Sequence, residues 1–170
     1  MTKLKKTKLL PEQIIEAATN GETNNLKVLI AQSKDSVILT VALNRASKNG
    51  HAECVRLLIP VSDVKYNKSY SLRSASRYGH TECVKLLIPV SEPKDNNSSA
   101  LQLAAKNNHK ECVELLLPYS DISKWSENRW QYINSEMQQV ILSYFSKISL
   151  TQNIILSNNQ NLKIGKINKI

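Results

Sequence analysis

Apolar and polar positions alternate along this chain in a pattern that returns every 29 residues. The block LLIP at 57–60 returns unchanged at 86–89 and as LLLP at 115–118. Ahead of each block, the segment NGHAECV at 49–55 returns as YGHTECV at 78–84 and as NNHKECV at 107–113. Similarity at a fixed period of this size indicates a repeat architecture. The pattern predicts four units, at 11–39, 40–68, 69–97 and 98–126.

Each unit is predicted to hold two short helices, and the fourth unit shows this most clearly. Leu101, Ala104 and Ala105 fall on one face of a helix over 99–107. A second, strongly apolar helix over 110–117 ends at Pro118, because proline cannot continue a helix. A helix pair this short has no core of its own and must stack on the next copy. The sequence therefore predicts an all-α protein, an α-solenoid of helix-turn-helix repeats.

All histidines and cysteines of the chain lie at repeat-equivalent positions. The glycines of the interhelix turns do so too, with Asn108 in place of glycine in the fourth unit, and these turn residues are expected to be left-handed. A catalytic or metal site is normally a single arrangement, so residues copied once per repeat are predicted to be structural. These structural repeat positions are Gly21, Gly50, His51, Cys54, Gly79, His80, Cys83, His109 and Cys112.

A metal site is the alternative for the recurring His-x-Glu-Cys motif. Each repeat supplies only one histidine and one cysteine, and stacked helices lie about 10 Å apart. Zinc needs all its ligands within roughly 2.0–2.3 Å of one centre. A cysteine followed by valine on an apolar helix face is also more typical of an inert, buried thiol than of a nucleophile. The sequence therefore predicts no metal, no cofactor and no catalytic residue.

The segment SALQLAAKNNHKECVELLL at 99–117 resembles the signature of the ankyrin repeat family, and ALNRASKNGHAECVRLLI at 42–59 resembles a more divergent copy. The resemblance covers about residues 11–126. The usual ankyrin period is about 33 residues, four more than here. The missing residues fall where the family carries a protruding β-hairpin. The resemblance thus implies an ankyrin-type α-solenoid with shortened hairpin loops, at 62–68 and 91–97.

The two ends of the chain differ from the repeats. Residues 1–10 form a basic arm, and 127–148 are predicted to be a degenerate capping repeat. Its apolar residues are expected to cover the last full unit: Trp130, Ile133, Val140, Ile141 and Phe145. Residues 149–170 are expected to be either a helical extension of this cap or a basic tail.

The net charge of +9 is concentrated at the ends. Most of it comes from seven lysines there, so the repeats between them are close to neutral: Lys3, Lys5, Lys6, Lys8, Lys163, Lys166 and Lys169. This balance does not mark the folded part as a nucleic-acid binder. We see no signal peptide and no run of about 20 apolar residues that could span a membrane. Three cysteines in such a chain favour a reducing compartment.

The candidate binding residues are those that vary at equivalent exposed positions. In ankyrin proteins, the two residues before the interhelix glycine face the concave groove. The resemblance therefore implies a groove lined by eight residues: Thr19, Asn20, Lys48, Asn49, Arg77, Tyr78, Lys106 and Asn107. The last six are the candidate partner-binding residues. The pair Arg77 and Tyr78 is the strongest candidate, because arginine and tyrosine are enriched at interface hot spots. Tyr66 and Tyr70, expected in the loop just upstream, add an aromatic cluster. The alternative for the basic column Lys48, Arg77 and Lys106 is a solvated face in a lysine-rich chain. A second basic column, at Lys27, Arg56 and Lys85 on the outer helices, is interpreted as a solvated face.

These observations favour a non-catalytic protein that binds a partner protein through the concave groove, as a monomer. The composition and the family resemblance suggest a host-directed or viral effector, acting in the cytoplasm or in the host cytosol. The alternative is binding to nucleic acid or another anionic surface through the basic ends and the groove column. No acid–base pair, phosphate loop or metal cluster supports an enzyme.

Overall fold

The computed structural model of the chain describes residues 9–123 and 125–167, with the side chains at 97 and 153–167 left out of the description. Four helix pairs come first: α1 (Leu10–Asn20) with α2 (Thr23–Gln32), α3 (Ser36–Asn49) with α4 (Ala52–Leu58), α5 (Tyr66–Tyr78) with α6 (Thr81–Leu87), and α7 (Asp95–Lys106) with α8 (Lys110–Leu116). A short α9 (Glu127–Trp130) and a long α10 (Ser135–Ile167) follow. The described residues contain helices and no strand, which confirms the predicted all-α repeat solenoid.

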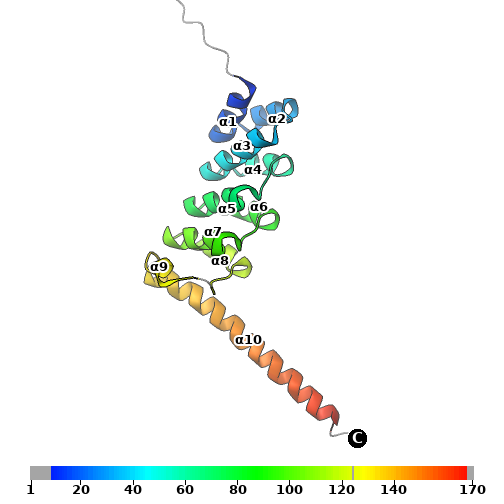
Figure 1. Ribbon diagram of the computed structural model, residues 1–170, viewed down its shortest axis with the longest axis vertical. Helices are drawn as coiled ribbons and strands as arrows, with labels where there is room; N and C mark the ends of the chain where they lie inside the picture. The colour runs from blue at the N-terminus through cyan, green and yellow to red at the C-terminus, as the bar shows by residue number, and fades with distance from the viewer. Residues whose placement is uncertain (1–8, 124, 168–170) are drawn as a thin grey trace, which may run out of the picture.

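The helix pairs stack along the long axis of the molecule (Figure 1). Helices α1, α3, α5 and α7 contact one another in sequence and form one row, which we call the inner helices. Helices α2, α4, α6 and α8 form the second row, the outer helices. Each pair therefore buries its apolar side chains mainly against the next pair rather than within itself.

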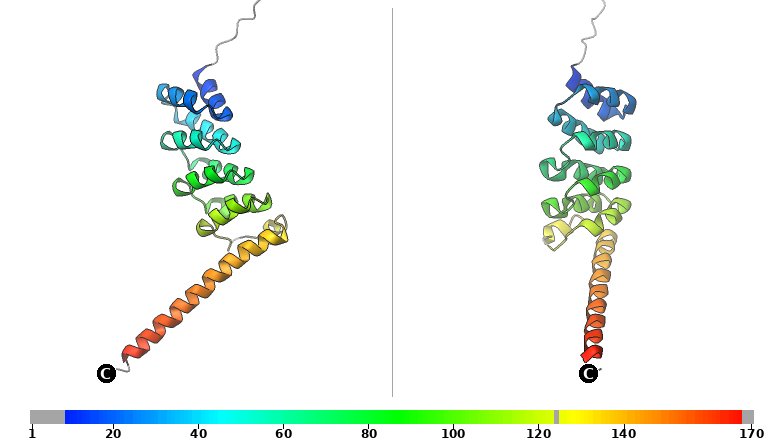
Figure 2. Two further views of the ribbon diagram at one scale, coloured as in Figure 1. Left: turned by 180° about the vertical axis from the view of Figure 1, so that it is seen from behind. Right: turned by 90° about the vertical axis from the view of Figure 1, so that its right-hand side faces the viewer.

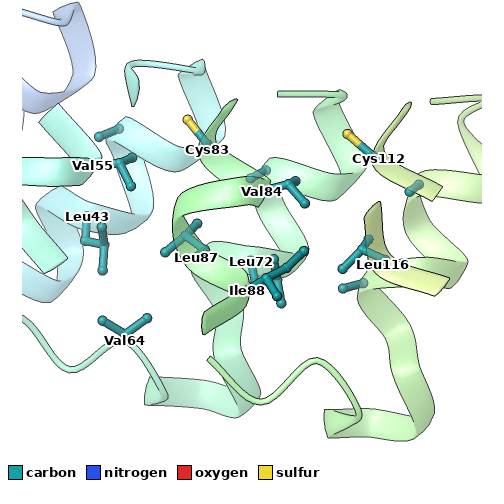
Figure 3. Packing of buried hydrophobic residues seen from close by; sticks show 14 of the residues in the cluster. Leu43, Val55, Val64, Leu72, Cys83, Val84, Leu87, Ile88, Cys112 and Leu116 are labelled. Atoms are coloured by element: carbon teal, nitrogen blue, oxygen red, sulfur yellow. The ribbon is translucent and has the colours of Figure 1, made fainter. Parts of the chain in front are cut away.

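The core lies between the two rows and repeats with the sequence (Figure 3). Leu43 and Leu72 from the inner helices, and Val84, Leu87 and Leu116 from the outer ones, are fully buried. Small residues on the inner helices, such as Ala46 and Ala75, are fully buried too and let neighbouring inner helices approach closely. Burying each large aliphatic side chain contributes roughly 1.5–3 kcal/mol, so stacking holds the repeats together.

Left-handed residues join the helices within each pair. Gly21, Gly50 and Gly79 follow their inner helices with φ of 76°, 79° and 74°, and Asn108 takes φ of 59° in the fourth pair. The prolines that follow the outer helices lie in short 3₁₀ turns, at Ile59–Val61, Ile88–Val90 and Leu117–Tyr119. Proline thus ends the α-helix, and the chain continues as one 3₁₀ turn before the connection begins.

The connections between pairs are shorter than the sequence suggested. Loops were expected at 62–68 and 91–97, but α5 begins at Tyr66 and α7 at Asp95. The first turn of α5 is left-handed, with φ near 50° at Asn67, Lys68 and Ser69. The repeat boundary drawn at 39/40 therefore falls inside α3, whereas those at 68/69 and 97/98 fall in the left-handed openings of α5 and α7, where Asn96 and Ser98 also have positive φ. The chain passes between pairs at 33–35, 62–65 and 91–94.

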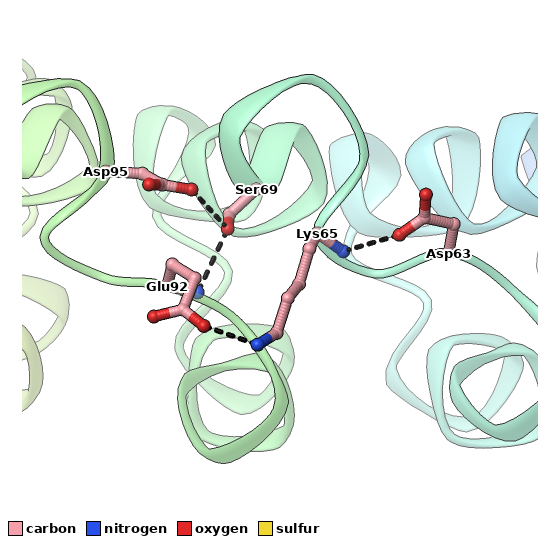
Figure 4. Close-up of polar contacts among 5 residues, drawn as sticks. All are labelled: Asp63, Lys65, Ser69, Glu92 and Asp95. Atoms are coloured by element: carbon pink, nitrogen blue, oxygen red, sulfur yellow. Dashed lines mark hydrogen bonds and ion pairs between the residues drawn. The ribbon is translucent and has the colours of Figure 1, made fainter.

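A hydroxyl near the start of each of the helices α3, α5 and α7 anchors the connection that follows that helix pair. The side-chain oxygens of Thr40, Ser69 and Ser98 accept the backbone N–H of Asp63, Glu92 and Asp121 at 2.9, 3.0 and 2.7 Å. Ser69 also donates to a carboxylate oxygen of Asp95 at 3.2 Å, and Lys65 forms an ion pair with Glu92 across two connections (Figure 4). These bonds satisfy buried polar groups where the chain turns from one repeat to the next.

The C-terminal end closes the stack with a single long helix. Ile133, Met137 and Ile141 are buried in the common core, and Trp130, Val140 and Phe145 pack against it. Residues 146–152 are all exposed, and α10 leads away from the repeats (Figure 2). Because α10 passes residue 148 without a break, the proposed boundary between a capping repeat and residues 149–170 does not coincide with a structural one.

No helix in the described ranges is both long enough and apolar enough to cross a membrane. Residues 1–8, which contain most of the predicted basic arm, and residues 168–170 lie outside the described residues.

Candidate partner-binding face

The exposed sides of the inner helices form one continuous face of the stack. Successive inner helices lie side by side, so residues 29 apart form columns across the repeats. Asn44 and Arg73 share one column, and Lys48 and Arg77 share another, four residues further along each helix. Residues at this spacing lie on the same side of a helix. We call this surface the inner-helix face.

A hollow of about 130 Å³ lies at the middle of the inner-helix face. Four of the predicted residues meet there with others that the sequence analysis did not single out, and we call it the central hollow. Its lining is Lys48, Tyr70, Arg73, Ser74, Arg77, Tyr78 and Leu103. A second hollow of about 180 Å³ shares Lys48 and Tyr70 and adds Val41, Asn44 and Arg45. The two together form a basic and aromatic surface over α3 and α5.

Cations and aromatic rings alternate within the central hollow. Two cations lie near the ring of Tyr78, with Nζ of Lys48 at 5.7 Å and Cζ of Arg77 at 5.9 Å from its centroid. Cζ of Arg73 lies 5.5 Å from the centroid of Tyr70. Cation–π contacts of this length hold the cationic groups near the rings without neutralising their charge. Both tyrosines remain about 40% exposed, so their rings are available to a ligand.

The cations of the inner-helix face have no carboxylate partner in the part of the chain that the structure describes: Arg45, Lys48, Arg73, Arg77 and Lys106. On the outer helices, by contrast, Arg56 pairs with Glu53 and Lys85 with Glu82. The two basic columns seen in the sequence therefore differ in their surroundings. The outer one is locally balanced by acids at two of its three positions, and the inner one is not.

The remaining predicted residues lie around this centre. Lys106 lies one repeat further along, with its Nζ 4.6 Å from the ring centroid of Tyr132. Asn49 and Asn107 are exposed, but their amides donate to the backbone carbonyls of Thr19 and Leu103 at 3.0 and 2.7 Å.

The two upstream tyrosines were expected in a loop but lie within α5. Tyr70 joins the central hollow, because it precedes Arg73 and Arg77 by one and two helical turns. Tyr66 lines a different hollow, beside Ser36, Val37, Thr40, Val41 and Asp63. The left-handed turn at 67–69 separates the two tyrosines along the helix, so they do not form one cluster.

Sequence reasoning missed Arg45, Arg73 and Tyr132. The spacing of Arg73 and Arg77, four residues apart, could have placed both on one helical face. Tyr132 was not predictable in this way, because it follows α9, where the 29-residue register no longer fixes the position of each side chain.

The histidines connect the inner-helix face to the turns. Nε2 of His51, His80 and His109 lies 2.9, 2.9 and 3.0 Å from the carbonyl oxygen of Thr19, Lys48 and Arg77, respectively. A carbonyl oxygen can only accept, so Nε2 carries the proton and donates. Each histidine thus holds the backbone of a residue of the inner-helix face in the preceding repeat.

The cysteines lie in the hydrophobic core. Cys54, Cys83 and Cys112 are all buried as free thiols, and Cys83 and Cys112 occupy equivalent places in successive repeats (Figure 3). Burial raises the pKa of all three thiols, that of Cys83 to about 11. A thiol of raised pKa is a poor nucleophile and a poor metal ligand at neutral pH. No three metal-ligating side chains come together among the residues that the structure describes.

The first repeat gives the inner-helix face an acidic end. A broad hollow of about 420 Å³ is lined there by Glu12, Ile15, Glu16, Thr19 and Asn20. Glu16 stands one repeat before Arg45 in the same column, and Thr19 stands one repeat before Lys48. The face therefore changes from acidic at α1 to basic at α3 and α5.

These features define an α-solenoid of helix-turn-helix repeats with a variable surface on its inner helices. A family model of ankyrin repeats, three copies long, matches residues 14–90 and also residues 43–128. The matches together cover more than half of the chain, which belongs to the ankyrin repeat family. A search of curated proteins gives no match to this sequence.

Proposed function

We propose that this protein binds a partner protein through the inner-helix face and catalyses no reaction. Ankyrin repeats are generally protein–protein interaction modules, and this family membership supports the coarse assignment. The central hollow supports the inner-helix face as the binding surface, since it brings Lys48, Arg77 and Tyr78 together. Neither Lys48 nor Arg77 forms an ion pair with a described carboxylate. Arginine and tyrosine supply much of the binding energy of many interfaces. The host-directed role and the host cytosol as its location remain predictions from composition and family resemblance.

The rigidity of the surface also supports binding without rearrangement. The residues of the inner-helix face are carried by packed helices, and the histidine bonds hold the backbone at Lys48 and Arg77. A preformed surface loses less conformational entropy on binding than a mobile loop does. We therefore expect the partner to meet a face that is already in its bound shape.

Capture of partners from a nuclease-treated lysate tests the proposal. An Arg77→Ala/Tyr78→Ala variant is compared with wild type and with an Arg56→Ala/Lys85→Ala variant, which removes the same number of side chains from the outer helices. We expect a protein that wild type and the outer-helix variant both retain and that the inner-helix variant loses. Retention by all three forms would place the binding surface elsewhere.

Binding to nucleic acid is the second candidate, supported by the same unbalanced cations and by the lysines near the two ends. It predicts that affinity falls steeply with salt, because phosphate contacts release bound counterions. It also predicts that nuclease treatment abolishes capture. A protein partner that survives nuclease treatment and is lost on Tyr78→Ala would favour the first candidate.

A further inference from the structure

Three hollows of the inner-helix face join into one groove between α3 and α5. The hollow beside Tyr66 shares Val41 with the hollow of about 180 Å³, which in turn shares Lys48 and Tyr70 with the central hollow. We call the three together the α3–α5 groove. The inner helices lie across the long axis of the stack (Figure 1), so this groove crosses the stack instead of following the row of repeats.

Equivalent positions of two neighbouring repeats line the two ends of the α3–α5 groove. Val37 on α3 and Tyr66 on α5 are 29 residues apart and line one end. Lys48 and Arg77 are also 29 residues apart, and they line the other end. Val41 follows Val37 by one helical turn and precedes Lys48 by two, so all three lie on one side of α3.

The end of the groove at the start of the two helices is mainly apolar. Val37 and Tyr66 are 69% and 56% exposed, and Val41 is half-buried in the same lining. Asp63 is also part of this lining, and its carboxylate accepts the backbone N–H of Lys65 at 3.1 Å. The hollow measures about 140 Å³. A space of about 150 Å³ takes a benzene-sized group, so this end can receive one apolar side chain.

The opposite end of the groove is cationic, and its cations are accessible. Arg45, Lys48 and Arg77 are exposed. Within the described part of the chain, none of the three side chains forms an ion pair or donates a hydrogen bond. Lys48 and Arg77 contact only the ring of Tyr78 in this way, so their N–H groups are available to a carboxylate. Charge-assisted hydrogen bonds of this kind are among the stronger polar contacts.

We infer that the α3–α5 groove binds a short, extended protein segment with an apolar residue over Val37 and Tyr66 and an acidic residue over Lys48 and Arg77. The inference rests on the proposed function, because it names the partner segment that the inner-helix face takes. The acidic residue is complementary to cations that have no carboxylate partner, and such complementarity fixes the register of an interface. The apolar residue covers neighbouring apolar side chains that are otherwise exposed to water.

The length of the groove sets the spacing of the two residues in the segment. From Val37 to Lys48, α3 advances about 16 Å at about 1.5 Å per residue. An extended chain covers this distance in about five residues, at about 3.3 Å each. Alternate side chains of such a chain are roughly 6.6 Å apart, close to the rise of one helical turn. A residue between the two therefore lies over Val41 and Tyr70.

A nucleic acid fits this groove less well than a protein segment does. Its phosphates carry the same negative charge at every step. A strand that lay along the whole groove would bring phosphates towards the carboxylate of Asp63 and against the aliphatic side chain of Val37. The apolar end of the groove therefore favours a protein segment, in which an apolar and an acidic side chain follow one another.

Selection from a displayed library of random peptides of about ten residues tests the inference with the full chain. We expect enriched sequences to carry a large apolar residue and an Asp or Glu about five residues from it, in either order. Enriched sequences that are acidic without the apolar residue, or apolar without the acidic one, would overturn the inference. They would leave the proposed function standing, because a protein segment would still be bound.

Two double-mutant cycles on the best enriched peptide locate the two contacts. Replacing its apolar residue by Ala should weaken binding to wild type at least about fivefold, but binding to a Val37→Ser/Tyr66→Ser variant less than about twofold. Replacing its acidic residue by Gln or Asn should weaken binding to wild type about three- to tenfold, but binding to a Lys48→Gln/Arg77→Gln variant less than about twofold. Equal losses in wild type and variant, in either cycle, would show that the contact is not made, and the inference would fail.

A matched control on the outer helices and two further outcomes complete the test. An Arg56→Gln/Lys85→Gln variant should bind the peptide as wild type does, and circular dichroism shows whether each variant is folded. If no peptide is enriched while capture from lysate succeeds, the partner is not recognised as a short segment, and the inference is overturned with the proposed function standing. If capture fails as well, the proposed function itself is wrong.

A nucleic-acid partner would give a different result. A single-stranded DNA of about 12 nucleotides should bind more weakly than the best peptide. If it binds more tightly and loses affinity in the Lys48→Gln/Arg77→Gln variant, the groove takes a nucleic acid and the inference is overturned.

Discussion

The imidazole of His109 lies over Gly79, in the space that any side chain at position 79 would enter. A Cβ atom there would come within 2.7 Å of Cε1 and 2.8 Å of Cγ of the ring. Gly50 faces His80, and Gly21 faces His51, in the same way. Two independent features therefore require glycine at these turns: the positive φ of the backbone and the imidazole ring from the next repeat. This contact joins consecutive repeats at the edge of the inner-helix face.

The fourth turn shows what happens when no histidine follows. Asn108 occupies the position of the turn glycine, and its side-chain oxygen accepts a hydrogen bond from Nδ2 of Asn134 at 2.7 Å. Asn134 also accepts the backbone N–H of Met137 at 2.8 Å and so caps the start of α10. A side chain is thus tolerated at the last turn, where it links the repeats to the closing helix.

Coupling between Gly79 and His109 is the first prediction. Gly79→Ala should destabilise the protein by about 2 kcal/mol or more, from the left-handed backbone and the displaced ring. In a His109→Ala background, the same change should cost at least about 0.5 kcal/mol less, because the ring is absent. Urea unfolding of the four proteins gives the cycle. Additive costs would mean that the ring does not constrain position 79.

The buried thiols give a second prediction with a matched control. Among the described residues no hydroxyl bonds to Cys83, since Ala52 stands at the position equivalent to that of Thr81, whose hydroxyl lies 3.7 Å from Sγ of Cys112. Cys83→Ser should lower the free energy of unfolding by about 1–3 kcal/mol, because its hydroxyl would be buried without a partner. Cys112→Ser should cost less, because its hydroxyl can bond to Thr81. Thermal unfolding of both variants compares the two losses of stability. Equal losses would show that a hydrogen bond to Thr81 does not stabilise the serine at position 112.

The stability of the fold should fall in mildly alkaline solution. Burial raises the pKa of Cys83 from an ordinary 9.0 to about 11, so the folded state keeps the thiol proton when the unfolded state has lost it. The contribution of Cys83 is complete below about pH 9 and is lost as the pH rises towards 11. Comparing the unfolding free energies of wild type and Cys83→Ala between about pH 9 and pH 11 isolates the contribution of this thiol. If the difference between the two does not change with pH, the thiol is not shielded from solvent.

Ser69 should be important for the passage of the chain from the third helix pair to the fourth. Its Oγ accepts the N–H of Glu92 and donates to Asp95, and the residue is almost fully buried. Ser69→Ala leaves that N–H without a partner and should cost about 1–3 kcal/mol in unfolding free energy. Lys65→Ala, which removes the exposed ion pair with Glu92 shown in Figure 4, should change stability little. Chemical denaturation of the two variants tests this order, and a larger loss for Lys65→Ala would reverse it.

The repeated part of the fold was predictable because the residues that shape each helix pair recur every 29 positions. Helix pairs, left-handed turns and proline-ended outer helices all follow from residues that recur in register, such as Gly79 and Pro89. The exact start of α5 was not predictable, because the left-handed turn at 67–69 has no glycine to indicate it. The same is true of α10, since helical propensity alone does not tell where a helix leaves the core that stabilises its first turns.

The candidate face was only partly predictable. The resemblance to ankyrin repeats identified the positions before the turn glycines, and Lys48, Arg77 and Tyr78 do line one hollow. Arg73 was missed because its inclusion depends on how α3 and α5 lie against each other, which a single repeat does not show. The function of all these residues as a binding surface stays a prediction until a partner is in hand.

Photo-crosslinking from a defined position tests the central claim most directly. A benzophenone amino acid is placed at Tyr78 on the inner helices in one protein and at Arg56 on the outer helices in another. Both are irradiated in nuclease-treated lysate from the source cells or their host. We predict a discrete crosslinked protein from position 78 and none from position 56. A product from position 56 alone would contradict binding through the inner-helix face.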